Sequence, residues 1–521
     1  MNKPSLKWAA IPFLFSMLNF CLKAQTIKDA FFLAGSNKEE LIKVLKHYDP
    51  IKDAEKHSAA AFLIKNMGVH ESHAYNWYSN EGKKIYFSEF EYEDFSGALK
   101  AHRALKDSLK IRPRIKVEQD IMHITADLLI ENIDLAFKAW KENPWCRSYD
   151  YETFCEYILP YRSIIEPLEP WREECQFLVQ NASKNLEDKN DPVEVCTNIL
   201  NELKDFSFRF SSSPIPAPLL GTQQLLFRRE GSCPELANLA VLAARSMGVA
   251  ATFDYTPHYA ASSNRHFWNT VIDKEGKAIP FNGSSANDFK GTPYNYNANN
   301  KRMAKVIRNT YAIQSDALAS KIDKENIPSG FLRSKHIIDV TKTYMPVASI
   351  KYAFKLVDSM DIAYLNVFNL KRWQTVHWAK KEAGIFKFDD MGLNIVYLPS
   401  YYHNGVAVYA PYPMLLDEQG VQKTLKPNFK TVFNCTLSMN NTTPKKYQDE
   451  NNSTHIEADE NYTLFYWDYG WKTLDDAKAG HNGVSFKHVP DNALFLLLPE
   501  QSDGFERIFT IAAGTGTITW Y

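Results

Sequence analysis

The sequence lacks an excess of charge of either sign, because 60 lysines and arginines stand against 61 aspartates and glutamates, for a formal net charge of -1. Such a chain has no basic field to attract a nucleic-acid backbone. After residue 20 no apolar run is long enough to cross a bilayer as a helix. The sequence also contains no phosphate-cradling glycine loop, no HExxH pair and no nucleotide-binding fingerprint. We therefore expect no nucleic-acid partner, no integral membrane segment in the mature chain, no cofactor and no metal site.

Cysteine is scarce, with seven in 521 residues, which excludes a fold held together mainly by disulfides. No two cysteines have the short spacing of a zinc knuckle. The four between residues 146 and 196 either pair or are buried thiols, and both alternatives stay open. Beyond the first 24 residues the cysteines are Cys146, Cys155, Cys175, Cys196, Cys233 and Cys435.

The N-terminus has the pattern of a secretory signal peptide. Lys3 and Lys7 give it a positive start, and an apolar run over residues 8–20 follows. We predict that residues 1–24 are removed and that the mature protein is extracytoplasmic, in the periplasm, at the cell surface or secreted. The alternatives are an uncleaved anchor or a buried N-terminal helix. A lipid anchor at Cys21 is disfavoured, because large residues precede it.

The length predicts several domains, and the texture of the sequence changes along the chain. The first part has apolar residues at helical spacing. From about residue 341, short runs rich in branched and aromatic residues alternate with turn residues, which predicts β-sandwich structure, in two domains or one large one. The predicted fold class is therefore multidomain α+β. The predicted divisions are a helical N-terminal domain over 25–190, an α+β core over 191–300, a linker over 301–340, and β-sandwich domains over 341–430 and 431–521.

The stretch GSCPELANLAVLAARSMG, residues 231–248, predicts an amphipathic helix headed by Cys233. Pro234 suits the first turn of a helix, and Gly248 suits its end. The helix dipole and the free N–H groups at a helix start favour a thiolate, so Cys233 is a candidate nucleophile. The alternative is a small buried apolar residue that happens to begin a helix.

The next stretch, NRHFWNTVIDKEGKAIPFNGS, predicts a β-hairpin with a three-residue turn whose glycine is Gly276. In that register Asp273 pairs with Lys277, and Asn282 comes opposite Trp268. Asn282 then lies on the same face as His266, within side-chain reach. A loop of two or four residues would move Asn282 to the other face.

Cys233, His266 and Asn282 are the three residue types that nucleophilic cysteine chemistry needs. A thiol near its free pKa is mostly protonated at neutral pH. An imidazole can take that proton and later return it to a leaving amine. A third polar group that binds the far ring nitrogen fixes the tautomer and direction of the ring.

Two further candidates are predicted to touch the substrate. Trp268 either walls the cleft beside His266 or belongs to the core. Gln224, or its neighbour Gln223, could add a second donor to the backbone N–H of Cys233 in an oxyanion hole. The alternative for both glutamines is a solvated surface amide.

The motifs G-S-C-P-E with its alanine-rich helix, R-H-F-W-N and P-F-N-G resemble the core of the transglutaminase-like superfamily, over roughly residues 190–290. This resemblance implies a papain/transglutaminase-like α+β core, in which a Cys heads a helix packed on an antiparallel sheet and the His and an Asp lie on neighbouring strands. Asn282 stands where many members have Asp, and it would stabilise an imidazolium less. The flanking segments FCEYILPYR and VYLPSYY resemble large secreted proteins of Bacteroides-type bacteria.

The resemblance implies an extracytoplasmic cysteine enzyme, a protease, amidase or acyltransferase, that acts on peptide or carboxamide bonds of a protein, peptide or glycopeptide. Hydrolysis is favoured over transfer to an amine, because no segment suggests a dedicated amine tunnel. The alternative is a non-catalytic surface module whose β-domains bind peptide or carbohydrate. The aromatic side chains that could stack on a sugar are Trp373, Trp378, Trp467, Trp471 and Trp520.

Overall fold

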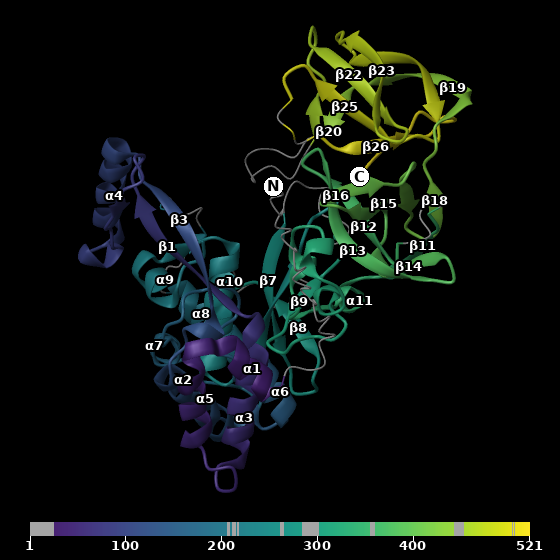
Figure 1. Ribbon diagram of the computed structural model, residues 1–521. Coiled ribbons are helices and arrows are strands. Elements are labelled where there is room, and N and C mark those ends of the chain that lie inside the picture. Colours follow the sequence, from purple (N-terminus) through teal and green to yellow (C-terminus); the bar gives the residue numbers. More distant parts are fainter. Residues whose placement is uncertain are drawn as a thin grey trace, which may run out of the picture.

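The computed structural model describes residues 26–205, 209–210, 215, 218–260, 265–283, 302–354, 360–441, 453–502, 504 and 506–521. The predicted signal peptide over residues 1–24 lies outside this part of the chain. Figure 1 shows helices gathered at one end of the molecule, a projecting arm beside them, and two β-rich units at the other end. In the described residues no helix is long and apolar enough to span a membrane.

The helical end is built from amphipathic helices whose apolar faces share one core. In the longest of them, α5, Thr125 caps the first turn by accepting a hydrogen bond from the Leu128 N–H at 3.3 Å. The common core extends from Ala30 to Tyr311 and includes Leu239 of α10, so it continues past the predicted boundary at residue 190. The helices are α1 (Ile27–Ala34), α2 (Lys38–His47), α3 (Ala54–Asn66), α5 (Ala126–Glu142), α6 (Tyr151–Tyr157), α7 (Arg172–Leu178) and α8 (Pro192–Asp205).

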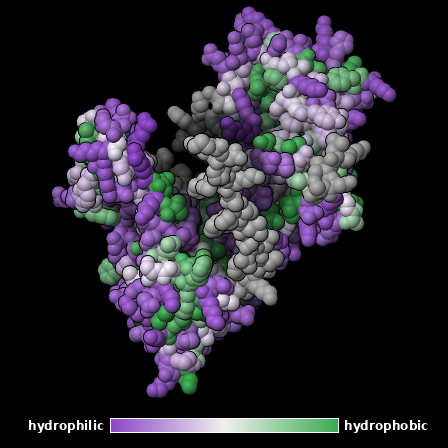
Figure 2. Space-filling model, in the orientation of Figure 1, coloured by the Kyte–Doolittle hydropathy of each residue, from purple (hydrophilic) through white to green (hydrophobic). Residues whose placement is uncertain are grey.

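The arm interrupts the helical region, which the sequence did not predict. Its long strands pair in antiparallel register from Glu71↔Gln119 to Tyr78↔Arg112, and its small core contains Trp77. In Figure 2 the surface of the arm is mainly hydrophilic. The apolar alternation that would reveal the strands is therefore weak in the sequence. The elements of the arm are β1 (Glu71–Tyr78), β2 (Lys84–Ile85), α4 (Phe95–Leu109) and β3 (Arg112–Gln119).

The central unit packs α10 (Cys233–Ser246) against a five-stranded sheet of order β10-β9-β6-β7-β8. A capping box starts the helix, because the Ser232 N–H donates to Glu235 Oε2 at 2.6 Å. The strands are β6 (Ala251–Thr256), β7 (His266–Ile272), β8 (Ala278–Phe281), β9 (Ile307–Asn309) and β10 (Ile337–Asp339). The short elements beside them are β4 (Arg209–Phe210), α9 (Thr222–Arg228), β5 (Glu230–Gly231) and α11 (Thr341–Tyr344).

The segment over 301–340, predicted as a linker, instead supplies β9 and β10 to this sheet. Each strand is three residues long, too short for a periodic apolar pattern to show. Arg308 of β9 is paired with Asp254 of β6, and this buried ion pair holds the added strands in register.

The C-terminal half is β-rich, as predicted, and forms two units. The first is an eight-stranded sheet in which most strands follow the order β11-β14-β13-β12-β15-β17-β18, with β16 paired to β15. Its strands are β11 (Val347–Tyr352), β12 (Ile362–Asn369), β13 (Arg372–Glu382), β14 (Ile385–Gly392), β15 (Ile395–His403), β16 (Val406–Tyr409), β17 (Met414–Leu416) and β18 (Gln422–Thr424).

The second unit packs a five-stranded sheet, β23-β22-β25-β26-β27, and the pair β19-β24 around one apolar core. The opposite face of the five-stranded sheet packs on the first unit through Leu496 and Trp467, which lie in one cluster with Phe368. The strands are β19 (Asn428–Leu437), β20 (Met439–Asn441), β21 (Ser453–His455), β22 (Asn461–Trp467), β23 (Trp471–Lys478), β24 (Val484–Asp491), β25 (Phe495–Pro499), β26 (Ile508–Ile511) and β27 (Ile518–Trp520).

Candidate active site

Cys233 is the first residue of α10, and its side chain is half-buried. Burial raises the pKa of the Cys233 thiol above its ordinary value. The backbone N–H groups of Phe267 and of Cys233 itself, together with the charge of Arg265, act in the opposite direction but do not outweigh it. The backbone N–H at the helix start therefore acts in the expected direction, but burial outweighs its effect on the pKa of the thiol. A base must take the proton before the sulfur can attack a carbonyl.

His266 begins β7 and directly precedes Phe267, whose backbone N–H lies near enough to the Cys233 sulfur to lower the pKa of the thiol. The imidazole lies over the indole of Trp268, with ring centroids 6.0 Å apart and planes 23° apart. Cys233 therefore meets the sheet at the end of the strand that carries His266.

The hairpin has the register that the sequence predicts. The Asp273 N–H donates to Lys277 O at 2.9 Å, and Gly276 has φ +78°. Asn269 pairs with Phe281, and continuing this register by one residue brings Asn282 opposite Trp268. The pairing ends at Phe281, the last residue of β8, so a common face for Asn282, Trp268 and His266 stays a prediction.

A buried polar network, which the sequence did not reveal, lies beneath this face. The fully buried carboxylate of Asp254 accepts hydrogen bonds from Arg308 at 2.8 and 2.9 Å, from Thr270 at 2.6 Å and from Tyr344 at 2.6 Å. The Tyr344 hydroxyl in turn accepts the indole N–H of Trp268 at 2.9 Å. Since the His266 ring lies on this indole, the network holds in place the surface on which the imidazole rests.

A family model of the transglutaminase-like superfamily matches residues 180–282, a range that contains Cys233, His266 and Asn282. Residues 180–282 form a transglutaminase-like domain. The crystal structure of a red sea bream transglutaminase is similar at 11% sequence identity, covering 70% of this chain and 78% of that chain, with a TM-score of 0.24. A comparison with curated proteins finds no match.

Trp268 of the transglutaminase-like domain is fully buried and belongs to the core with Tyr259, Met303 and Tyr344. Its indole therefore supports the His266 ring from beneath and does not line an open cleft. This is the second of the two alternatives that the sequence left open.

Gln224 lies on α9 of the same domain, and its amide is engaged in other contacts. Its Nε2 donates to Glu89 Oε1 at 2.5 Å and to the Tyr75 hydroxyl at 3.2 Å, and its Oε1 accepts from the Gly221 N–H at 3.3 Å. Gln223 donates to Glu174 at 3.4 Å. These bonds tie α9 to the arm and to α7, while the role of Gln224 in substrate binding stays a prediction.

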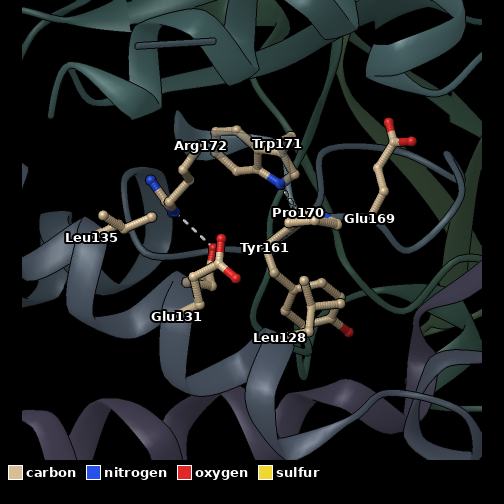
Figure 3. Close-up of a pocket in the computed structure, with 9 residues that line it drawn as sticks. Leu128, Glu131, Leu135, Tyr161, Glu169, Pro170, Trp171 and Arg172 are labelled. Carbon is tan, nitrogen blue, oxygen red and sulfur yellow. Dashed lines mark hydrogen bonds between the residues drawn. The ribbon is translucent and has the colours of Figure 1, made fainter. Parts of the chain in front are cut away.

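A pocket lies between α5 and the segment that leads into α7 (Figure 3). Trp171 donates to Tyr161 O at 2.7 Å and Arg172 to Asn132 Oδ1 at 2.7 Å, so these two polar side chains of its wall are bonded within the fold. A neighbouring pocket extends to His123 and Thr125. Neither pocket is lined by the three predicted catalytic residues. The residues that line the one in Figure 3 are Leu128, Glu131, Asn132, Leu135, Tyr161, Glu169, Pro170, Trp171 and Arg172.

The remaining described cysteines differ from Cys233 in their surroundings. All are free thiols, and Cys146, Cys155, Cys175 and Cys196 are buried in the shared core of the helices and α10. Burial raises the pKa of each of these four thiols, which makes them unreactive. No group of three or more metal-ligating side chains occurs within the described ranges.

Proposed function

We propose that the protein is a transglutaminase-like cysteine enzyme that transfers the acyl group of a peptide or carboxamide bond. The observation that carries this proposal is the half-buried sulfur at the start of α10, directly against the first residues of the strand that begins with His266. In the proposed reaction Cys233 is the nucleophile, His266 the base and then the acid, and Asn282 the group that orients the imidazole.

The proposed reaction has two steps. As the Cys233 sulfur bonds to the carbonyl carbon, His266 takes the thiol proton and then gives it to the leaving amine or ammonia. The acyl-enzyme thioester is then attacked by water, whose proton returns through His266 to the sulfur. The backbone N–H at the start of α10 is the proposed donor to the oxyanion. Water is the favoured acceptor, and transfer to an amine would follow the same steps.

The neutral side chain of Asn282 supports orientation of the ring more than stabilisation of its charged form. An amide oxygen can accept the far N–H of the imidazole and so fix its tautomer, but it brings no negative charge. In the proposed reaction His266 therefore takes the thiol proton from Cys233, whose pKa is raised by burial, without help from a negative charge at position 282.

We further propose that the enzyme acts outside the cytoplasm on a protein, peptide or glycopeptide, on the strength of the signal-like sequence at residues 1–24. The alternative is a non-catalytic surface module, which the raised pKa of Cys233 and the amide at position 282 keep open. The carbohydrate-binding form of that alternative has less support. Trp373, Trp467 and Trp471 pack on one another and on Phe368, with neighbouring ring centroids 5.2–5.7 Å apart.

The alkylation rate of Cys233 tests the proposal. The pH dependence of iodoacetamide labelling is measured by peptide mass spectrometry in the wild type and in His266→Ala. We expect the wild-type sulfur to react at pH 7 about tenfold or more faster than in His266→Ala, since the imidazole acts as its base. At strongly alkaline pH, where the thiolate forms without a base, the two rates converge.

Cys435 is the internal reference in the same digest, because it is also half-buried, has a pKa raised to about 11 by burial, and lies in the second β-rich unit. Its rate stays the same in both proteins. Equal Cys233 rates in both proteins at every pH would overturn the proposed Cys–His pair.

A further inference from the structure

We infer that Asn269 is a positioning residue of the proposed site, which holds the chain next to Asn282 against the helix that carries Cys233. This inference rests on the proposed function and deepens it. Asn269 lies on β7, three residues after His266, and is fully buried. Its side chain points to the opposite face of the sheet from His266 and Trp268, toward α10.

The amide of Asn269 joins two segments on either side of it. Its Nδ2 donates to the carbonyl of Ala237 in α10 at 2.8 Å. Its Oδ1 accepts from the backbone N–H of Gly283 at 2.9 Å. The first bond reaches the helix one turn after Cys233, and the second reaches the residue directly after Asn282.

Gly283 shows how closely the chain after Asn282 lies on this helix. A Cβ added at Gly283 would lie 2.7 Å from Ala240 Cβ, 2.9 Å from Leu236 O and 2.7 Å from Asn269 Oδ1. These distances are far inside van der Waals contact, so no side chain fits there. Asn269, the last residue of the motif R-H-F-W-N, and Gly283, the last residue of P-F-N-G, therefore contact each other directly.

Packing alone does not explain why a polar amide, which is costly to bury, occupies position 269. A leucine would fill a buried position between a strand and a helix without needing hydrogen-bond partners. Asparagine instead makes two directional bonds that fix β7, the end of β8 and α10 relative to one another. The bonds to Ala237 and Gly283 anchor the chain next to Asn282 on the helix that begins with Cys233, and a displacement of about 1 Å between catalytic groups can cost about a hundredfold in rate.

The experiment is a double-mutant cycle on the alkylation rate of Cys233 at pH 7, with the melting temperature of each protein measured alongside. The variants are Asn282→Ala, Asn269→Ala and the double variant. We expect both single variants to slow alkylation several-fold. The double variant should be no slower than Asn282→Ala alone, because Asn269 acts through the placement of Asn282.

Asn366→Ala is the matched control for the loss of a buried strand amide. Asn366 of β12 is 1% exposed, and its Nδ2 donates to Leu398 O at 2.7 Å and to Ser400 Oγ at 2.8 Å, within the first β-rich unit. Asn366→Ala should lower the melting temperature about as much as Asn269→Ala and leave the Cys233 rate unchanged. Asn269→Asp, which keeps an acceptor for the Gly283 N–H, should recover part of the rate.

Three outcomes would overturn the inference. If Asn282→Ala slows alkylation and folded Asn269→Ala does not, the proposed triad stands and the role of Asn269 fails. If the effects of the two substitutions multiply in the double variant, Asn269 acts independently of Asn282. If Asn282→Ala itself has no effect, the orienting role of Asn282 fails and the inference fails with it, while His266→Ala still decides the Cys–His pair.

Gly283→Ala replaces Asn269→Ala in the cycle if that variant does not fold. Its added methyl group would displace the chain beside Asn282 from Ala240 and from the Asn269 side chain, while the amide of Asn269 stays in the protein. The expected pattern is the same slowing of alkylation, without further slowing when it is combined with Asn282→Ala. A wild-type rate in folded Gly283→Ala would overturn the inference.

Discussion

At the scale of single residues, burial separates groups that look alike in the sequence. Cys146, Cys175, Cys196 and Cys233 all lie in or beside helices, but the first three are fully enclosed in the core. Only the fourth is in contact with a strand end that carries a histidine. The capping pattern around Pro234 is local, which is why the sequence alone could single this cysteine out.

Glu156 illustrates the effect of burial on a carboxylate. It accepts backbone N–H groups from Tyr311 and from Ala312, the latter at 3.2 Å. Burial raises the pKa of Glu156 to about 7, and these hydrogen bonds and the charge of Arg245 only partly oppose it. The folded protein therefore holds a proton on Glu156 that the unfolded chain has already lost between about pH 4.5 and pH 7.

This proton makes the folded state less stable as the pH rises through that window. We expect the free energy of unfolding of the wild type to fall by up to about 3 kcal/mol more between pH 4.5 and pH 8 than that of Glu156→Gln, which cannot ionise. Urea unfolding at both pH values measures the difference. Glu152→Gln, an exposed position in the same helix, serves as the control and should keep the wild-type pH dependence. The same dependence in Glu156→Gln would show that this carboxyl group does not titrate in the window.

At the scale of elements, the sequence predicted best where a local signal fixes the structure. The helix from Cys233 and the β7–β8 hairpin with Gly276 at its turn have their expected bounds and register, because caps and turns depend on neighbouring residues. The arm and strands β9 and β10 were missed. Their pairing joins segments far apart in the chain, such as Asp254 with Arg308, and no local pattern marks it.

The same reason explains what was missed at the candidate site. The hairpin register follows from the turn residues, and it is the basis for the prediction that His266 and Asn282 share one face. The supporting residues Asn269 and Tyr344 could not be singled out from the sequence, since each acts through a partner on another element, such as Ala237 or Asp254.

Gly248 at the end of α10 gives a prediction about how this helix is held. It has φ +75°, and a Cβ there would lie 2.7 Å from Cys146 Sγ and 2.8 Å from Ala139 O. Gly248→Ala should cost about 2–4 kcal/mol of stability, from backbone strain plus overpacking against α5. Gly276→Ala is the matched control, because its φ is +78° but no atom lies within 4 Å. It should cost about 1 kcal/mol or less, from strain alone. If urea unfolding gives similar losses of stability for both variants, the structure around Gly248 accommodates the extra methyl group without strain against Cys146.

At the scale of the whole molecule, neighbouring units along the chain pack directly against one another. The core of the helices continues into the transglutaminase-like domain. The central unit, to which β9 belongs, is tied to the first β-rich unit by Lys305, whose buried ammonium group donates to the carbonyls of Asp389 and Asp390 at 2.7 and 2.9 Å. Asn369 of the same unit donates to Tyr259 O at 2.8 Å, beside the floor of the candidate site. The first β-rich unit is therefore attached to the central unit beside Trp268, the residue on which the His266 ring lies.

The aromatic cluster between the two β-rich units gives the corresponding prediction. Trp467 is 4% exposed, its indole N–H donates to Pro411 O of the first unit at 3.0 Å, and its ring lies 5.5 Å from that of Trp373. Trp467→Ala should cost about 3–5 kcal/mol at this interface. Because the second unit keeps its own core, calorimetry should show it melting separately, below the main transition. Phe429→Ala, in the second unit and 53% exposed, should leave one transition. A single transition at nearly the wild-type temperature in Trp467→Ala would contradict this prediction. It would mean that the second β-rich unit stays attached to the first without the aromatic cluster.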